Sequence, residues 1–430
     1  MKFKLENEFQ DTEIGKIPRE WKVERLGHVV KYVKGRKPNV LFDERLSEEF
    51  VPYLTADYMR GLDKPKWCNP KLESNIIRVS RDDVIMIWDG SSGDVFTGFD
   101  GILASTMIRI MPSIEVNKKF LYYYLMVNFE KFRSTTVGTG IPHVNKKVFE
   151  EFPIPVPPLR EQVRIAEILS TVDRAIEVVD AGVVRLEGLK KALMRELLTG
   201  RIRVREENGK LVFNKETEFR DTEIGKIPRE WKIYNIEEIF DLYKGTTPSS
   251  KEDKYWGGDI PFVTPTDITA LNEMNKIYLS TTEKYLTEEG RRSKSLRLIP
   301  RGSLLFTSRA TIGYLAVNNV EVAINQGIIA LIPKIKDLDV SYYYYHLTSI
   351  RKKLEELAGG STYKEISMNT FRKFMIPYPP LEEQRKIAGI LSTVDRAIEL
   401  YREERVRLER LKRGLMDLLL TGRVRVVREG

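Results

Sequence analysis

Residues 9–23 read FQDTEIGKIPREWKV and residues 219–233 read FRDTEIGKIPREWKI, so thirteen of fifteen positions are identical in two stretches 210 residues apart. A second pair lies further along the chain. Residues 154–177 read IPVPPLREQVRIAEILSTVDRAIE, and residues 376–399 read IPYPPLEEQRKIAGILSTVDRAIE. An internal duplication is a stronger guide to architecture than any local motif. The repeat predicts a variable block followed by a long helix, twice over.

The second pair begins each predicted helix. Prolines at 153, 155, 157 and 158 delay the first helix, and apolar residues then recur at alternating spacings of four and three, which is the seam of a coiled coil. The two helices end in similar tails, LKKALMRELLTGRIRV at 189–204 and LKRGLMDLLLTGRVRV at 411–426. About 40 residues give a rod of roughly 60 Å. Each apolar stripe needs a partner, so the helices are predicted to pack on each other. The pattern alone allows parallel or antiparallel pairing.

Ten consecutive residues of the helices, 168–177 and 390–399, are identical, polar positions included. Packing would require only the apolar ones to match. Recent duplication is one explanation, and docking of the same partner on two equivalent surfaces is the other, which we favour because the intervening blocks have diverged. The candidate docking residues are Glu161, Gln162, Asp173, Arg174, Glu177, Glu383, Gln384, Asp395, Arg396 and Glu399.

The variable blocks, roughly residues 20–153 and 230–375, mix short apolar runs with glycine-bearing turns and a few helical stretches, which predicts an α+β fold. Tyrosine clusters at 122–124 and 342–345 lie in helical stretches. They are predicted to pack in the core rather than to stack on bases.

Three loops recur at matching places in the two blocks and carry groups suited to DNA. The first is 34–38, matched by 244–248; the second is 88–93, matched by 308–313; and the third is 138–147, matched by 360–369. Lys and Arg neutralise phosphates, Arg and Asn can pair with base edges, and Gly allows close backbone approach. The side chains differ between copies, as two modules reading different sequences would require, although divergence of ordinary solvated loops gives the same pattern. The candidate DNA-binding residues are Lys34, Arg36, Lys37, Ser91, His143, Asn145, Lys146, Lys147, Lys244, Thr246, Thr247, Ser249, Lys251, Arg309, Thr311, Tyr363, Lys364 and Asn369.

Composition narrows the class of protein. There are 71 Lys and Arg against 62 Asp and Glu, a net charge of +9 that favours a polyanionic partner but also fits an ordinary basic surface. Cys68 is the single cysteine and the three histidines are scattered, so neither a disulfide nor a metal cluster is expected. The sequence has no apolar run that could span a membrane and no signal peptide, so a cytoplasmic protein is expected.

Catalytic motifs are missing. The sequence has no GxxxxGK[ST] phosphate loop, no [DNS]-P-P-[YF] tetrapeptide, no glycine-rich turn of adenosylmethionine type and no Pro-Asp dipeptide of the common nuclease core. The expected class is therefore a binding protein without a cofactor of its own.

The duplicated motifs resemble those of the specificity subunits of Type I restriction-modification systems. They are G-K-I-P-x-x-W, I-P-x-P-P-L-x-E-Q and L-L-T-G-R, each present twice. The resemblance implies two target-recognition domains, each reading one half of a bipartite DNA site, joined by an antiparallel helical spacer. It implies two methyltransferase subunits and motor-nuclease subunits as partners, which would hold catalysis, adenosylmethionine and ATP. A fragment of a combined restriction-modification enzyme and a bivalent adaptor without DNA remain the alternatives.

This resemblance also sets the expected domain boundaries. They are 1–153 for the first recognition domain with the N-terminal repeat segment, 154–200 for the first spacer helix, 201–218 for a linker, 219–375 for the second recognition domain, and 376–430 for the second spacer helix and tail.

Overall fold

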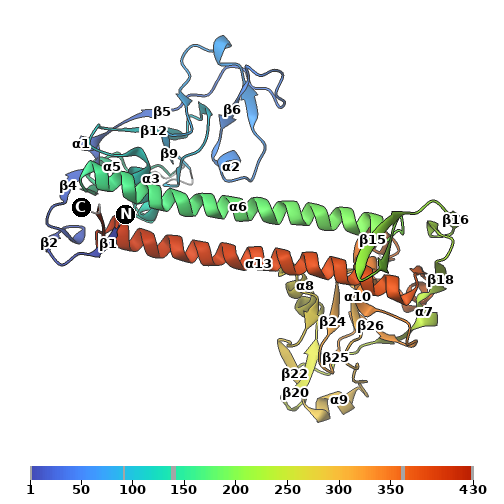
Figure 1. Ribbon diagram of the computed structural model, residues 1–430. Helices are drawn as coiled ribbons and strands as arrows, with labels where there is room; N and C mark the ends of the chain where they lie inside the picture. Colours follow the sequence, from blue (N-terminus) through green and yellow to red (C-terminus); the bar gives the residue numbers. More distant parts are fainter. Residues whose placement is uncertain (1, 91–92, 137–141, 360–363, 428–430) are drawn as a thin grey trace. The chain divides into compact units, whose positions relative to one another are not determined.

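The computed structural model describes residues 2–90, 93–136, 142–359 and 364–427 (Figure 1). The chain divides into two compact units. Unit 1 comprises residues 1–178 together with 404–430, and unit 2 comprises residues 179–403. Each unit therefore combines a variable block with the first half of one long helix and the second half of the other.

The first part of the chain supplies most of unit 1. In chain order its elements are β1 (Lys2–Leu5), β2 (Phe9–Thr12), β3 (Gly15–Pro18), β4 (Lys22–Arg25), α1 (Leu26–Val29), β5 (Val30–Lys34), β6 (Val51–Leu54), α2 (Ala56–Met59), β7 (Lys66–Cys68), the 3-10 helix η1 (Pro70–Leu72), β8 (Arg78–Val79), β9 (Val84–Ile87), β10 (Val95–Phe96), β11 (Gly101–Leu103), β12 (Met107–Pro112), α3 (Lys118–Val127), α4 (Phe129–Ser134), α5 (Lys146–Glu151), β13 (Pro153–Val156) and α6 (Leu159–Leu197).

The rest of the chain repeats this order with small differences. Its elements are β14 (Ile202–Glu207), β15 (Lys210–Lys215), β16 (Phe219–Thr222), β17 (Gly225–Pro228), β18 (Lys232–Asn235), α7 (Ile236–Ile239), β19 (Phe240–Lys244), the 3-10 helix η2 (Asp253–Tyr255), β20 (Trp256–Val263), α8 (Pro265–Glu273), β21 (Tyr278–Leu279), β22 (Lys284–Leu286), α9 (Glu288–Ser293), β23 (Leu304–Thr307), β24 (Leu315–Asn318), β25 (Ala323–Ile324), β26 (Ile328–Pro333), α10 (Val340–Ser349), α11 (Arg351–Glu356), α12 (Met368–Arg372), β27 (Met375–Tyr378), α13 (Leu381–Leu420) and β28 (Val424–Val427).

Two sheets form the body of each unit, as the predicted α+β fold requires. Unit 1 has the strand orders β10-β9-β12-β5 and β7-β6-β11-β8, and unit 2 has β19-β26-β23-β24-β21 and β22-β20-β25. All four residues of β9 (VIMI) are apolar, because both faces of the strand are buried. Val84 and Met86 belong to one core, and Ile85 and Ile87 belong to another. In unit 2, β23 divides its side chains between two cores in the same way.

Both tyrosine clusters pack inside, as predicted. In unit 1, Tyr123 and Tyr124 are buried in the core beside α6, and all four tyrosines of 342–345 are buried in unit 2. Each cluster lies on a helix whose start is capped by a side chain, Asn117 for α3 and Asp339 for α10. The clusters are therefore packing residues and not stacking platforms for bases.

The long helices run antiparallel. In unit 1, Lys412 Nζ of α13 lies 2.5 Å from Asp173 Oδ1 of α6. In unit 2, Lys190 Nζ of α6 lies 2.6 Å from Asp395 Oδ1 of α13. Residue numbers thus rise along one helix as they fall along the other (Figure 1). The pairing is antiparallel, which the seam pattern alone does not decide. No helix among the described residues is both long and apolar enough to cross a membrane.

A buried ion cluster joins the two repeats within unit 1. Arg425, in the strand after α13, donates to Glu161 at the start of α6 from Nε and Nη2, at 2.7 and 2.8 Å. Its guanidinium also bonds Glu6 and Glu20. Trp21 Nε1 donates to the same Glu161 carboxylate, at 3.2 Å. These bonds raise the pKa of the Arg425 guanidinium despite its burial. We call this group of residues the closing joint of unit 1.

Unit 2 has the same joint with the repeats exchanged. Arg203, after α6, donates to Glu383 at the start of α13 from Nε at 2.7 Å, and Trp231 Nε1 donates to that carboxylate at 3.0 Å. Glu216 and Glu230 accept from the remaining nitrogens of Arg203. The three duplicated motifs of the sequence therefore meet at one place in each unit.

The glycine of each L-T-G helix end belongs to this joint. Gly422 has φ +71°, a left-handed conformation that favours glycine. A Cβ there would lie 2.4 Å from the Pro18 ring, beside Trp21. Gly200 has φ +68° and the same relation to Pro228 and Trp231. The glycines both end the helices and let the G-K-I-P-x-x-W segments pack closely.

The chain ends meet as a pair of strands in unit 1. β1 pairs antiparallel with β28, and Phe3 lies opposite Val426. In unit 2 the matching pair is β14 with β15, where Phe213 lies opposite Val204 and the strands are joined by a turn at Asn208 and Gly209. The stretch 201–218, predicted as a linker, is thus largely this hairpin.

We expect the Arg425→Leu substitution to destabilise the protein by about 3 to 5 kcal/mol, because it leaves the Glu161 carboxylate buried without its cation. Denaturant unfolding of the two proteins would measure the difference in the free energy of unfolding. Lys71→Met is the control, since Lys71 and Glu49 form an exposed ion pair whose loss should cost at most about 1 kcal/mol. Equal effects of the two substitutions would contradict a stabilising role for the joint.

Candidate nucleic-acid interface

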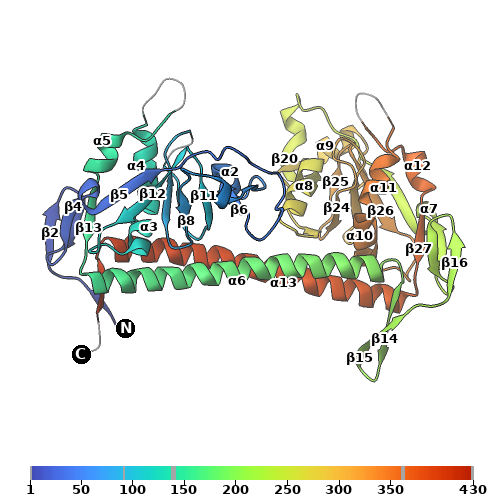
Figure 2. The ribbon, with the colours of Figure 1, turned by 90° about the horizontal axis from the view of Figure 1, so that it is seen from above.

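The three loops predicted to contact DNA come together in unit 1. Lys34 Nζ at the end of β5 lies 2.7 Å from Asp89 Oδ2 in the loop after β9. The Gly90 amide donates to the Pro142 carbonyl at 2.7 Å, and the Val144 amide donates to the Trp88 carbonyl at 2.9 Å. Backbone bonds therefore hold the second and third loops to each other, and an ion pair joins the first to them. Helix α5 begins at the end of the third loop, and in Figure 2 it lies on the side of unit 1 away from α6 and α13.

The matching loops of unit 2 come together by the same pattern. Lys244 pairs with Glu365, the Ile366 amide donates to the Ser308 carbonyl at 3.0 Å, and the Ala310 amide donates to the Lys364 carbonyl at 3.3 Å. An isolated bridge joins Arg309 and Glu365, as one joins Asp89 and His143 in unit 1. The framework is shared, while the side chains on it differ.

A fourth loop completes each cluster, and the sequence reasoning missed it. It joins two strands that are consecutive in the sequence but belong to different sheets, at 104–106 between β11 and β12 in unit 1 and at 325–327 between β25 and β26 in unit 2. The Thr106 carbonyl accepts from the amides of Trp88 and Asp89, and Gln326 bonds Thr247. Glutamine can pair with adenine on two atoms. The only sequence signal is a short polar break, A-S-T or N-Q-G, between two apolar runs.

Gly35 and Gly245 pack closely against their own chain. A Cβ on Gly35 would lie 2.1 Å from the Ala104 carbonyl oxygen, and one on Gly245 would lie 2.0 Å from that of Ile324. These contacts fix the first loop against the fourth and account for glycine at both positions without DNA. Close approach of these glycines to a DNA backbone stays a prediction.

The candidate DNA-binding side chains differ in their exposure to solvent. Those exposed to solvent are Lys34, Arg36, Lys37, Lys146, Lys147, Thr246, Ser249, Lys251, Thr311, Lys364 and Asn369, and those partly covered are His143, Asn145, Lys244, Thr247 and Arg309. Lys146 and Lys147 pair loosely with Glu150 and Glu151. Ser91 and Tyr363 lie outside the described residues.

Asn145 is less suited to base reading than the sequence suggests. Its Oδ1 accepts from the amides of Lys147 and Val148, at 3.0 and 3.3 Å, and so caps α5. Pairing with a base on two atoms needs that oxygen as well as the amide nitrogen. A role in positioning α5 accounts for this residue better.

The candidate docking residues fall into three groups. Glu161, Gln162, Glu383 and Gln384 are buried, and both glutamines bond backbone groups of their own unit. For these four the structure gives an internal role in place of the predicted docking role, because their side chains do not reach the surface. Arg174, Glu177, Arg396 and Glu399 are exposed, and for them docking stays a prediction.

Asp173 and Asp395 form the third group and attach the recognition domains to the helices. Tyr123 Oη of α3 donates to Asp173 at 2.6 Å, and Tyr345 Oη of α10 donates to Asp395 at 2.7 Å. Lysines 412 and 190 pair with the same carboxylates and lie over the tyrosine rings. Burial and these bonds raise the pKa of both tyrosines well above the usual range. The identity of these aspartates in the two repeats thus has an internal explanation.

The duplicated scaffold and its paired loop clusters correspond to a known class. Residues 18–181 and 228–410 match the family model described as the Type I restriction modification DNA specificity domain. The chain belongs to this family. It is therefore a specificity subunit and not a catalytic one. Its relatives are also named specificity subunits.

Several relatives match over most of the chain. The MjaVIII specificity subunit of Methanocaldococcus jannaschii is 32% identical over 99% of this chain and 98% of its own. The EcoR124I/EcoR124II specificity subunit of Escherichia coli is 27% identical over 86% of this chain and 85% of its own. The crystal structure of the Type I S subunit from M. genitalium shares the fold, with a TM-score of 0.58 at 16% identity over 93% of this chain and 96% of that one.

We expect Gly35→Ala to destabilise unit 1 by about 1 to 3 kcal/mol, because the new methyl group would press on the Ala104 carbonyl. Gly188→Ala provides the matched control. Gly188 lies on an exposed face of α6 with open space around its Cα, so the same change should stabilise by up to about 1 kcal/mol. Urea midpoints of the two variants would show opposite shifts, and shifts of the same sign would refute this account of Gly35.

Proposed function

We propose that each cluster of loops reads one half of a bipartite DNA site, unit 1 with the first recognition domain and unit 2 with the second. The convergence of four loops twice, on one framework of backbone bonds with different side chains, is the observation that carries this proposal. The frameworks would place the loops alike in the groove, and the differing side chains would select different bases.

The exposed polar side chains of the loops divide into two roles in this proposal. Lys37, Lys146 and Lys147 in unit 1, and Lys251 in unit 2, would neutralise phosphates. Arg36, Lys364 and Asn369 carry groups able to pair with base edges. The antiparallel helices, 39 and 40 residues long, would set the spacing. A rod of roughly 60 Å exceeds one duplex turn of about 34 Å, so several unread base pairs would separate the halves.

We propose two methyltransferase subunits and the motor-nuclease subunits of the same system as protein partners. Two exposed and identical surfaces, around Arg174 and Glu177 on α6 and around Arg396 and Glu399 on α13, would serve two identical subunits. The reactions, with adenosylmethionine and ATP, would belong to these partners. An assembly that modifies DNA in this way would work in the cytoplasm.

Replacing Arg36 by Ala in the assembled methyltransferase should relax the specificity at one position of one half-site, with a loss of about 1 to 3 kcal/mol for the preferred base. Lys364→Ala should act on the other half-site alone. Sequencing of the modified bases in a randomised DNA library would give both profiles. Lys71→Ala, a change of an exposed lysine outside the loop clusters, should leave the profile unchanged. Relaxation of both halves by Arg36→Ala would refute the assignment.

Exchange of a whole domain is a larger change with a simpler result. Residues 20–153 would be replaced by the equivalent block of another specificity subunit, which keeps the spacer helices. We expect the modified sequence to change in one half and to keep the other half and the spacing. A change in both halves, or in neither, would rule out one domain for each half-site.

A further inference from the structure

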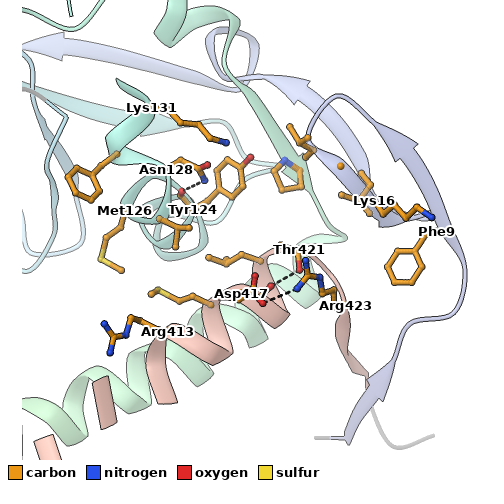
Figure 3. Close-up of a pocket in the computed structure, with 18 residues that line it drawn as sticks. Phe9, Lys16, Tyr124, Met126, Asn128, Lys131, Arg413, Asp417, Thr421 and Arg423 are labelled. Carbon is orange, nitrogen blue, oxygen red and sulfur yellow. Dashed lines mark hydrogen bonds and ion pairs between the residues drawn. The ribbon is translucent and has the colours of Figure 1, made fainter. Parts of the chain in front are cut away.

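A cavity of about 910 Å³ opens at one corner of unit 1. It lies between the β2–β3 hairpin, the end of α3 with the start of α4, and the last turns of α13 (Figure 3). Its floor is apolar, formed by Phe9, Ile14, Tyr124, Met126, Met416 and Leu420. We call it the first corner pocket.

Unit 2 has a cavity of about 780 Å³ at the corresponding place, the second corner pocket. It lies between the β16–β17 hairpin and the end of α6, with the β14–β15 hairpin on a third side. Residues at equivalent positions line both pockets: Phe9 and Phe219, Ile14 and Ile224, Lys16 and Lys226, Thr421 and Thr199, Arg423 and Arg201. Five pairs of equivalent residues thus line the two pockets, whereas the third wall differs: the end of α3 with the start of α4 in the first pocket, and the β14–β15 hairpin in the second.

Packing alone does not explain why these lining residues match. The hairpins must keep Ile17 and Trp21, and Ile227 and Trp231, because these are buried. Lys16 and Lys226 are exposed, yet they are identical, while the recognition blocks beside them have diverged. A surface that is kept twice in a diverged chain indicates the same occupant on both units.

The charges around both pockets indicate what that occupant carries. The acidic residues at each pocket already have cations: Asp417 pairs with Arg423, Glu196 with Arg195, and Glu216 with Arg203. Among the described residues the remaining rim cations form no ion pair. These are Lys16, Lys131 and Arg413 at the first pocket, and Arg201, Lys215 and Lys226 at the second. The occupant is therefore expected to bring carboxylates.

We propose that each corner pocket receives an apolar side chain flanked by carboxylates, on a segment of one methyltransferase subunit. This rests on the proposed function, which supplies two identical protein partners. The apolar floor favours a protein segment over DNA, because a phosphate backbone would satisfy the cations and leave the floor uncovered. Filling both pockets would attach one subunit to each unit, at a place separate from the exposed stripes of α6 and α13.

Charge reversal at each pocket tests this proposal. One variant carries Lys16→Glu and Arg413→Glu, a second carries Lys226→Glu and Lys215→Glu, and a third carries all four changes. All four side chains are exposed, so the fold should be kept. Native mass spectrometry of the full-length chain mixed with methyltransferase subunits would count the subunits bound. We expect at least about tenfold weaker binding of one subunit in each double variant and of both in the quadruple variant.

A control and a second measurement separate the possible outcomes. Lys64→Glu with Lys71→Glu changes the charge equally at exposed positions that do not line the pocket, and two subunits should still bind. Two subunits bound tightly to the quadruple variant would overturn the proposal. The proposal would also be overturned if the quadruple variant lost affinity for DNA but still bound two subunits. The same holds if the four changes altered only the association of the chain with a second copy of itself. A wild-type chain that bound no methyltransferase subunit would instead refute the proposed function.

Discussion

A buried carboxylate at the start of each long helix governs the architecture of this protein. Glu161 and Glu383 are charged groups removed from water, and a buried charge requires a partner of opposite sign. The partner arginine in each case follows the end of the other helix. The ends can meet in this way only if the helices are antiparallel and nearly equal in length, as 39 and 40 residues are. Orientation and length of the spacer thus follow from two ion clusters.

The same clusters explain why the duplicated segments, although far apart in the sequence, depend on one another. Trp21 donates to the carboxylate, and Gly422 brings the end of α13 against Pro18. A change in any one segment would disturb the other two, which keeps all three similar in both repeats. The loop clusters are free of this constraint, because backbone amides and carbonyls provide most of their mutual bonds. Side chains there can change without loss of the framework, which is what variable specificity requires.

Much of this fold could be predicted from the sequence, because the repeat, the seam and the buried strands leave periodic patterns. The tyrosine clusters were placed correctly in the core by their helical context. Identity between repeats misled the prediction for Glu161, Gln162, Glu383 and Gln384, since an internal bond and a docking contact preserve a polar residue equally. Gly35 is ambiguous for a similar reason, because close approach to the chain and close approach to DNA both demand glycine. The loop at 104–106 left only a short polar break as a signal, since its contacts come largely from backbone groups.

The pairing of β1 with β28 has a consequence for how the two units are completed. In unit 2 the equivalent strands belong to one continuous hairpin, whereas in unit 1 they are the two ends of the chain. Each unit takes its closing strand and its arginine from the opposite repeat, so half a chain could not complete a unit alone. Two separate half-length chains could complete both units by exchanging these strands. A break in the turn at Asn208 and Gly209 would therefore leave every bond of both closing joints available to the two pieces.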